Sequence, residues 1–273
     1  MTPPRNATKN SNGPRLYPWP PPPAEHDIWV PSATSVLGVI NKPAIAGWKV
    51  KQCAEGAIRL HKTGALAALI AQDEKMAEAA IKSAWKTDLD AAGDAGTLIH
   101  ARLEAQIKNE PLPEMTEEAE QVFANVQKIL DDYSVEVLYS ECTVYGTHRN
   151  LEWGGTLDMI VEMDIPGQGR GLYVADLKTG KGVYLESCLQ VGGAYANADK
   201  LVTGDNGEII DMPEVDGAVI FHVRQDKSLV IPVAADDTAY KAFMAARTFW
   251  GIQNDKSWTS VFAPLPKTIT GDK

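Results

Sequence analysis

The sequence predicts an α/β protein in which a helical front half precedes a mixed β-sheet flanked by helices. Two observations carry this prediction. Apolar residues recur at helical spacing from Ser32 to about Tyr133, and the period changes to strand-like alternation at residue 134. Strand-like and helical segments then follow one another to about residue 254. With 273 residues, the chain is long enough for one large domain or two small ones.

The first 31 residues differ in composition from the rest of the chain. They hold nine of the 17 prolines, including PWPPPP at 18–23. This composition predicts a polyproline-like, flexible arm without a core of its own. An unstructured leader and a segment recognised by a proline-binding partner are both compatible with it.

Four helices are predicted in the front half: 43–61, 65–85, 94–109 and 117–133. Pro43 stands near the start of the first helix, where a missing N–H costs little. Asp94 is a suitable N-cap for the third helix. The fourth has acidic residues in its first turn, as the helix dipole favours.

The second half alternates strands with helices. Strands are predicted at 134–146, 156–164, 171–178, 216–223 and 228–234, and helices at 185–200 and 236–254. The first three strands are joined by short connections, which is typical of an antiparallel hairpin or meander. The segment 256–273 is a polar tail. The chain therefore divides into an arm (1–31), a helical part (32–133), a sheet-containing core (134–255) and the tail.

Charge and cysteine content restrict the classes of function. The chain has 26 basic and 36 acidic residues, a net charge of −10, which disfavours a passive coat on nucleic acid. An enzyme whose carboxylates bind cations stays compatible with this balance. Cys53, Cys142 and Cys188 form no CxxC pair, which excludes a four-cysteine iron–sulfur site and favours a reducing compartment. No apolar run approaches the ~20 residues of a membrane span, so we expect a cytoplasmic protein that binds no membrane.

The stretch VADLKTGKG (174–182) contains candidate catalytic and metal-binding residues of the predicted sheet. Side chains alternate along a strand, so Asp176 and Lys178 point to one face. If IPGQG (165–169) forms a five-residue loop, the register places Asp158 opposite Asp176. Two carboxylates there can hold one or two hard divalent cations, and a lysine can orient the attacking water. An ordinary salt-bridged hairpin end is the alternative.

Two nucleotide-binding motifs are ruled out. A P-loop requires GxxxxGK followed by Ser or Thr, but Gly182 follows Lys181. GQGRG (167–171) joins two strands rather than opening a helix, so it is a turn.

The combination GGTLDMIV…VADLKTG resembles the PD-(D/E)XK nuclease superfamily, and within it the RecB-like group. GTLIHARLE (96–104) is similar to an upstream helix of that group, and a downstream helix carries Gln190 and Tyr195. PSATSVLG…KPAIAGW (31–48) is similar to segments of phage-encoded members. The resemblance covers about residues 31–200 and implies a restriction-endonuclease-like core. It also implies Mg²⁺ or Mn²⁺ as cofactor, one or two ions, without the iron–sulfur cluster of the CRISPR-associated relatives.

The resemblance also implies a role for individual residues. His100 would bind the metal together with Asp158, Asp176 and the backbone carbonyl of Leu177, and Lys178 would be the catalytic lysine. The supporting or DNA-contacting residues would be Glu104, Glu141, Gln190, Tyr195 and Lys181. Gln190 and Tyr195 are five positions apart, which an ideal α-helix turns by about 140°. One of the two would then leave the site, unless Gly192 and Gly193 distort the turn.

The function expected from these residues is metal-dependent DNA hydrolysis, as an exonuclease in phage-type recombination, replication or repair. DNA ends, single- or double-stranded, are the expected partner. A recombinase or single-strand-binding protein as a further partner, and a homo-oligomer, stay open. The alternative is a catalytically degenerate nuclease fold that acts as a DNA-processing scaffold or binding protein.

Overall fold

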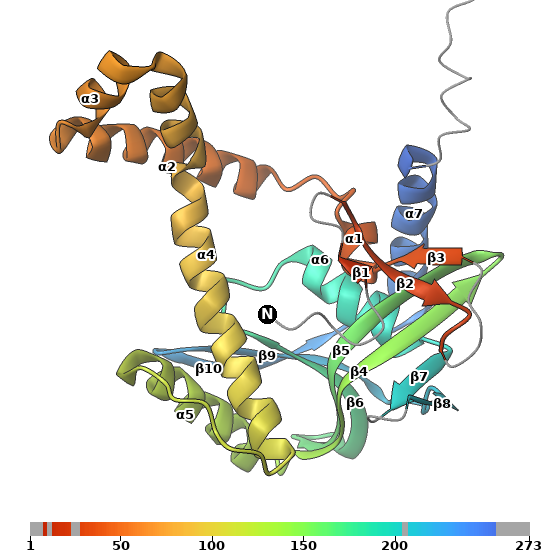
Figure 1. Cartoon of the computed structure of the whole chain (residues 1–273). Coiled ribbons are helices and arrows are strands. Elements are labelled where there is room, and N and C mark those ends of the chain that lie inside the picture. Colours follow the sequence, from red (N-terminus) through yellow and green to blue (C-terminus); the bar gives the residue numbers. More distant parts are fainter. Residues whose placement is uncertain (1–7, 10–12, 23–27, 204–206, 255–273) are drawn as a thin grey trace, which may run out of the picture.

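A seven-stranded mixed sheet forms the centre of the computed structural model, which describes residues 8–9, 13–22, 28–203 and 207–254 (Figure 1). The strand order is β10-β9-β6-β5-β4-β7-β8. The strands are β4 (Glu136–His148), β5 (Leu151–Ile165), β6 (Gly169–Lys178), β7 (Lys200–Thr203), β8 (Glu208–Asp211), β9 (Gly217–Arg224) and β10 (Lys227–Val233). The predicted α/β class with a mixed sheet is therefore confirmed, whereas β7 and β8 had not been predicted.

Neighbouring strands are antiparallel except β6 and β9, which run parallel. The hairpin of β5 and β6 pairs Ile165 with Gly169 and Met159 with Ala175. The connection of only three residues preserves the register that a five-residue loop predicts, because the pairing continues for one step into that loop. The next step along both strands brings Asp158 to the level of Asp176.

Helices cover both faces of the sheet. Ile99 and Leu103 of α4 (Glu74–Ile107), together with the apolar side of α5 (Glu117–Asp132), pack on one face. The other face is covered by α1 (Ala33–Leu37), by residues 191–195 and by α7 (Asp237–Asn254). Among the described helices, none combines the length and apolarity needed to cross a membrane.

Two helices were predicted at 65–85 and 94–109, and the structure instead places the break between its two helices at Asp73, inside the first predicted helix. After α2 (Pro43–Lys62) and the short α3 (Ala65–Gln72), α4 runs for 34 residues without interruption. Asp73 is its N-cap and accepts a hydrogen bond from the backbone N–H of Lys75. The predicted helix start at Asp94 is therefore wrong, since residue 94 lies inside α4. A capping residue within an amphipathic run does not interrupt a helix that tertiary contacts stabilise on both sides.

The Pro-rich segment was predicted to be an arm without a core, and its described residues contradict this. Strands β1 (Thr8–Lys9), β2 (Arg15–Trp19) and β3 (Ile28–Pro31) form a small antiparallel sheet. Tyr17 and Val30 of this sheet are buried against Tyr145 and Val202 of the central sheet. Pro18 of β2 lies beyond Arg15 and Leu16, the residues of β2 that pair with β1, and Pro31 lies in the edge strand β3, so prolines are tolerated at both positions. The predicted tail 256–273 lies outside the described residues.

The predicted helix 185–200 is divided into three kinds of turn. A single α-turn, α6 (Leu185–Cys188), leads into a π-helix, η1 (Leu189–Ala194), and then into a 3₁₀ turn, η2 (Tyr195–Asn197). A π-helix closes its hydrogen bonds over five residues instead of four. This change of period decides where Gln190 and Tyr195 lie.

Candidate metal and catalytic site

Three acidic residues lie in a row across three neighbouring strands. In β4 and β5, Ser140 pairs with Met159 and Cys142 with Leu157, so Glu141 lies opposite Asp158. One strand further, Asp176 of β6 follows Ala175, the partner of Met159. Strand pairing alone therefore brings together carboxylates that are up to 35 residues apart in sequence.

The alternation of β4 and β5 switches face at this row. Leu157 and Ile160 both pack with the core under α1 and α7, although strict alternation would place them on opposite faces. Opposite Asp158, Glu141 has a φ of 50°, in the left-handed region that a non-glycine residue rarely adopts. A backbone of this kind costs of order 1–3 kcal/mol, and such conformations concentrate at functional sites.

His100 reaches the row from α4. Its Nε2 donates to the backbone carbonyl of Leu177 at 3.0 Å, and its Nδ1 lies 3.5 Å from Asp158 Oδ2. The same carboxylate oxygen accepts the N–H of Leu177 at 2.9 Å. Both backbone groups of Leu177 thus contact predicted site residues. Two of the three predicted ligand side chains, His100 and Asp158, are therefore adjacent to each other and to the predicted backbone carbonyl.

Lys178 forms an ion pair with Asp176, whose side chain is almost completely buried. Burial and the neighbouring Asp158 raise the pKa of Asp176, and Lys178 and His100 oppose this only in part. Burial lowers the pKa of Lys178, but the charges of Asp176 and Asp158 outweigh it, so that the pKa lies above its ordinary value. Lys178 is therefore a protonated donor rather than a base.

The residues of the row suit a hard cation. One ligand atom each of His100, Glu141 and Asp158 lie within 4.8 Å of one another. Burial, followed by the charges of Asp158 and Glu104, raises the pKa of Glu141 to about 8. A bound cation would oppose this shift, because it favours the ionised carboxylate. Carboxylate and carbonyl oxygens are the donors that Mg²⁺ and Mn²⁺ prefer, whereas an imidazole is more usual as a ligand of Zn²⁺, Fe²⁺ or Ni²⁺.

A cavity of about 530 Å³ lies over the row. It is lined by the predicted residues His100, Glu104, Glu141, Asp158, Asp176, Leu177, Lys178, Gln190 and Tyr195. Glu104, one turn beyond His100, is ion-paired with Lys108. Lys181 lies exposed in the bend after β6 and does not line the cavity, so the structure does not bring it to the other site residues.

Residues that the sequence prediction missed complete the wall of this cavity. Arg15 and Tyr17 of β2 and Thr34 of α1 face it. The hydroxyls of Tyr17 and Thr156 lie 2.9 Å apart, which ties the small sheet to β5 beside Asp158. The alternation of Arg15, Tyr17 and Trp19 was the available signal, but the surrounding prolines obscured it.

The π-helix brings Gln190 and Tyr195 to the same side of the helix, facing the cavity. Gln190 Nε2 donates to the Tyr195 hydroxyl at 2.7 Å and lies 3.3 Å from Thr34 Oγ1. Tyr195 is buried against Gly155, where a Cβ atom would meet its ring at 2.5 Å. Of the two alternatives left open by the five-residue spacing, the distorted turn is the one that occurs, and both side chains line the cavity.

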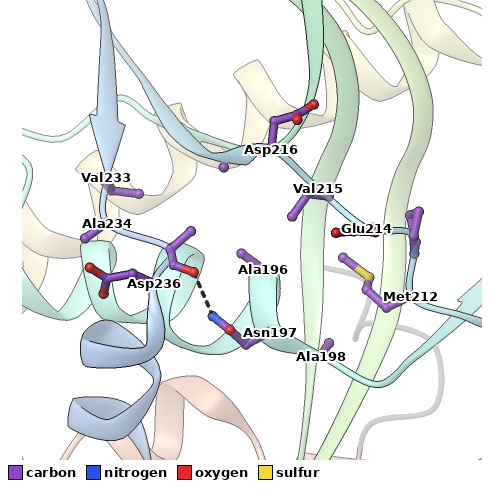
Figure 2. Close-up of a pocket in the computed structure, with 13 residues that line it drawn as sticks. Ala196, Asn197, Ala198, Met212, Glu214, Val215, Asp216, Val233, Ala234 and Asp236 are labelled. Atoms are coloured by element: carbon purple, nitrogen blue, oxygen red, sulfur yellow. Dashed lines mark hydrogen bonds between the residues drawn. The ribbon is translucent and has the colours of Figure 1, made fainter.

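A second, larger cavity of about 610 Å³ lies away from the row, between η2, the segment before β9 and the segment before α7 (Figure 2). Three of its polar side chains have structural partners. Asp236 accepts the N–H of Ala239 at the start of α7, and Asp216 accepts the N–H of Leu172. Asn197 donates to the carbonyl of Ala235, the dashed contact in Figure 2. These partners give the cavity a structural role, and we assign it no chemistry.

Comparisons with known proteins do not identify a family. No family model matches the chain, and no curated protein matches it. Among solved structures, a chain described as "Crystal structure of SSO0001" aligns at 12% identity with a TM-score of 0.29, over 62% of this chain and 84% of that one. A TM-score this low does not establish a shared fold.

Proposed function

We propose that the protein is a divalent-metal-dependent DNA nuclease with a restriction-endonuclease-like core of the PD-(D/E)XK type. The observation that carries the proposal is the row of Glu141, Asp158 and Asp176, with His100 on one side and a protonated Lys178 on the other. An ordinary salt bridge between Lys178 and Asp176 would account for neither the imidazole nor the third acid.

In the proposed reaction, His100, Glu141, Asp158, Asp176 and the carbonyl of Leu177 hold one or two Mg²⁺ or Mn²⁺ ions. When bound, the metal supplies a Lewis acid that lowers the pKa of a water and offsets phosphate charge. Lys178 donates a hydrogen bond and a positive charge where negative charge develops on the phosphate. Gln190 and Tyr195 shape the opposite wall of the cavity.

We extend the proposal to DNA ends as substrate, and thus to an exonuclease of phage-type recombination, replication or repair in the bacterial cytoplasm. This extension rests on the resemblance of GTLIHARLE, GGTLDMIV and VADLKTG to the RecB-like group. The cavity walls formed by β2 and α4 are compatible with it, because they border the row on two sides.

Digestion of DNA tests the proposal. End-labelled linear DNA and closed circular DNA of the same sequence are incubated with the wild type and Mg²⁺ or Mn²⁺. We expect metal-dependent release of nucleotides from the linear form only. Asp176→Asn and Lys178→Gln should each lower the rate at least ~10³-fold, the scale seen when a charge-stabilising group is removed.

The matched control is Asp211→Asn, which makes the same change in an exposed ion pair between Asp211 of β8 and Lys200 of β7. It should keep wild-type activity. Wild-type DNA cleavage by Asp176→Asn or by Lys178→Gln would contradict the proposal. Cleavage of the circle as well would retain a nuclease but overturn the requirement for an end.

A further inference from the structure

The segment that contains α2, α3 and the first turns of α4 is a basic part of an acidic chain. Residues 42–86 contain eight Lys or Arg and four Asp or Glu, against 18 and 32 in the rest. In Figure 1 these helices extend away from the sheet as an arm, and α4 continues from the arm to the candidate site as one helix. A partner attracted to this arm carries negative charge.

Three lysines of the arm lie on the same side of α4 as His100. Lys75, Lys82 and Lys86 precede His100 by 25, 18 and 14 residues. At 3.6 residues per turn these separations are about seven, five and four whole turns. We call Lys75, Lys82 and Lys86 the lysine row.

Contacts at the lysine row leave charge available to a partner. Lys82 pairs with Glu78, an exposed i,i+4 pair that contributes little. Lys86 lies beside the ring of Trp85, with Lys49 of α2 at 4.1 Å from the ring centroid. Within the part of the chain that the structure describes, no carboxylate lies within ion-pair distance of Lys75.

The distances from the lysine row to the site match a DNA duplex. With a rise of ~1.5 Å per residue, the lysines lie roughly 21 to 38 Å from His100 along the helix axis. Phosphates along one strand of B-DNA are ~3.4 Å apart along the duplex axis. A duplex whose axis runs along α4 would therefore place phosphates about six to eleven base pairs from the site opposite the lysine row.

From these observations we infer that the lysine row of α4 is a track for the phosphate backbone of double-stranded DNA, which holds the duplex while its end occupies the candidate site. This inference rests on the proposed function and adds to it the form of the substrate. It also offers an acidic protein a way to bind DNA, because residues 42–86 carry eight basic and only four acidic residues.

Binding measured without divalent metal tests the inference separately from cleavage. Fluorescence anisotropy gives the Kd of a labelled duplex of roughly 30 base pairs over a series of salt concentrations. The variant Lys82→Gln/Lys86→Gln should bind at least ~5-fold more weakly at moderate salt. Its plot of log Kd against log salt should lose about two units of slope, since each phosphate contact contributes ~0.9.

The control variant is Lys51→Gln/Lys62→Gln. Cys53 and Gly56 are on the side of α2 that contacts α4, and Lys51 and Lys62 lie about 120° or more from both around the helix. The control variant removes the same charge, and Lys51, like Lys82, is already in an i,i+4 ion pair, here with Glu55. We expect its Kd to stay within twofold of the wild type. A hairpin stem of about five base pairs does not reach the lysine row, so the wild type and both variants should bind it equally.

Equal weakening in both variants, no weakening in either, or no binding of duplex by the wild type would each overturn the inference. A changed elution volume of the lysine-row variant in size-exclusion chromatography would show that the row binds a second copy instead, and would also overturn it. Cleavage of DNA by the wild type is scored in a separate assay with Mn²⁺. A wild type that binds through the lysine row but does not cleave contradicts the proposed function alone.

Discussion

Among single residues, Glu141 shows most clearly that the site lowers the stability of the fold. It is largely buried, lies opposite a second carboxylate and adopts a φ of 50°. Like charges directly opposite on paired strands destabilise a sheet, and the backbone adds strain. A divalent cation between these side chains would offset both costs, which is why we place Glu141 among the metal ligands.

The pKa of Glu141 predicts how stability without metal depends on pH. Its pKa is near 4.5 when exposed and about 8 in the fold. Between these values the folded state holds a proton that the unfolded state has lost, so stability falls as pH rises. Glu141→Gln removes this pH-dependent fall in stability, because glutamine does not ionise. In EDTA, we expect its Tm to match the wild type near pH 5 and to exceed it by ~5 °C or more near pH 8.

Differential scanning fluorimetry at both pH values measures this difference. Glu136→Gln, on the same strand but exposed, is the control and should shift Tm equally at both. A Tm difference for Glu141→Gln that is the same at pH 5 and pH 8 would contradict the assigned burial and charge environment.

The row was predictable in part from the sequence. Asp158, Asp176 and Lys178 lie on a hairpin whose short connection determines the register, so their proximity follows from strand periodicity. The positive φ of Glu141 could not be predicted from the sequence, because the alternation of apolar residues does not show where a strand changes the face on which its side chains lie. Arg15 and Tyr17 were missed because prolines around them indicate a chain without regular structure.

The π-helix is the decisive feature at the scale of elements. It places Gln190 and Tyr195 in hydrogen-bond contact despite a spacing that an α-helix would splay. Gly192 and Gly193 permit it, since they pack directly against the segment before α7 and against α7 itself. Hydrophobic periodicity predicted a helix here. It could not predict a π-helix, because a π-turn differs from an α-turn by only one residue.

Gly192→Ala tests this element. The added Cβ would meet the carbonyl oxygen of Ala234 at 1.9 Å, so backbone must move. Overpacking of this kind costs about 1–3 kcal/mol, or a fall in Tm of roughly 2–10 °C. We also expect DNA cleavage to fall because Tyr195 shifts. Gly47→Ala in α2, where a Cβ meets nothing within 4 Å, is the control and should keep or raise Tm. Wild-type Tm and cleavage in Gly192→Ala would contradict the described packing.

The small N-terminal sheet gives a second test of an element. Tyr17 is fully buried and its hydroxyl contacts Thr156 next to the row. Tyr17→Ala should cost about 3–5 kcal/mol, as does loss of other buried aromatic rings. Tyr17→Phe removes only the hydroxyl contact and should cost about 1 kcal/mol. Chemical denaturation measures both. If Tyr17→Ala costs no more than Tyr17→Phe, the segment is the loose arm that composition alone predicts.

The whole molecule separates charge of opposite sign. Carboxylates gather at the candidate metal site, while the basic helices α2 and α3 and the start of α4 extend away from the sheet. Sequence periodicity predicted the α/β class, but the sequence did not predict this separation of charge, because the lysine row depends on α4 continuing through residue 94. A net charge of −10 is thus compatible with DNA binding when cations are provided both by bound metal and by one side of one helix.

Mn²⁺ titration followed by Tm tests most directly the central claim, that Glu141, Asp158, Asp176 and His100 form a divalent-metal site. A ligand at ~100 times its Kd stabilises the folded state by ~2.7 kcal/mol, or roughly 5–10 °C here. We predict this rise for the wild type and its loss in Asp158→Asn/Asp176→Asn. No rise in the wild type, or the same rise in the double variant, would contradict the account.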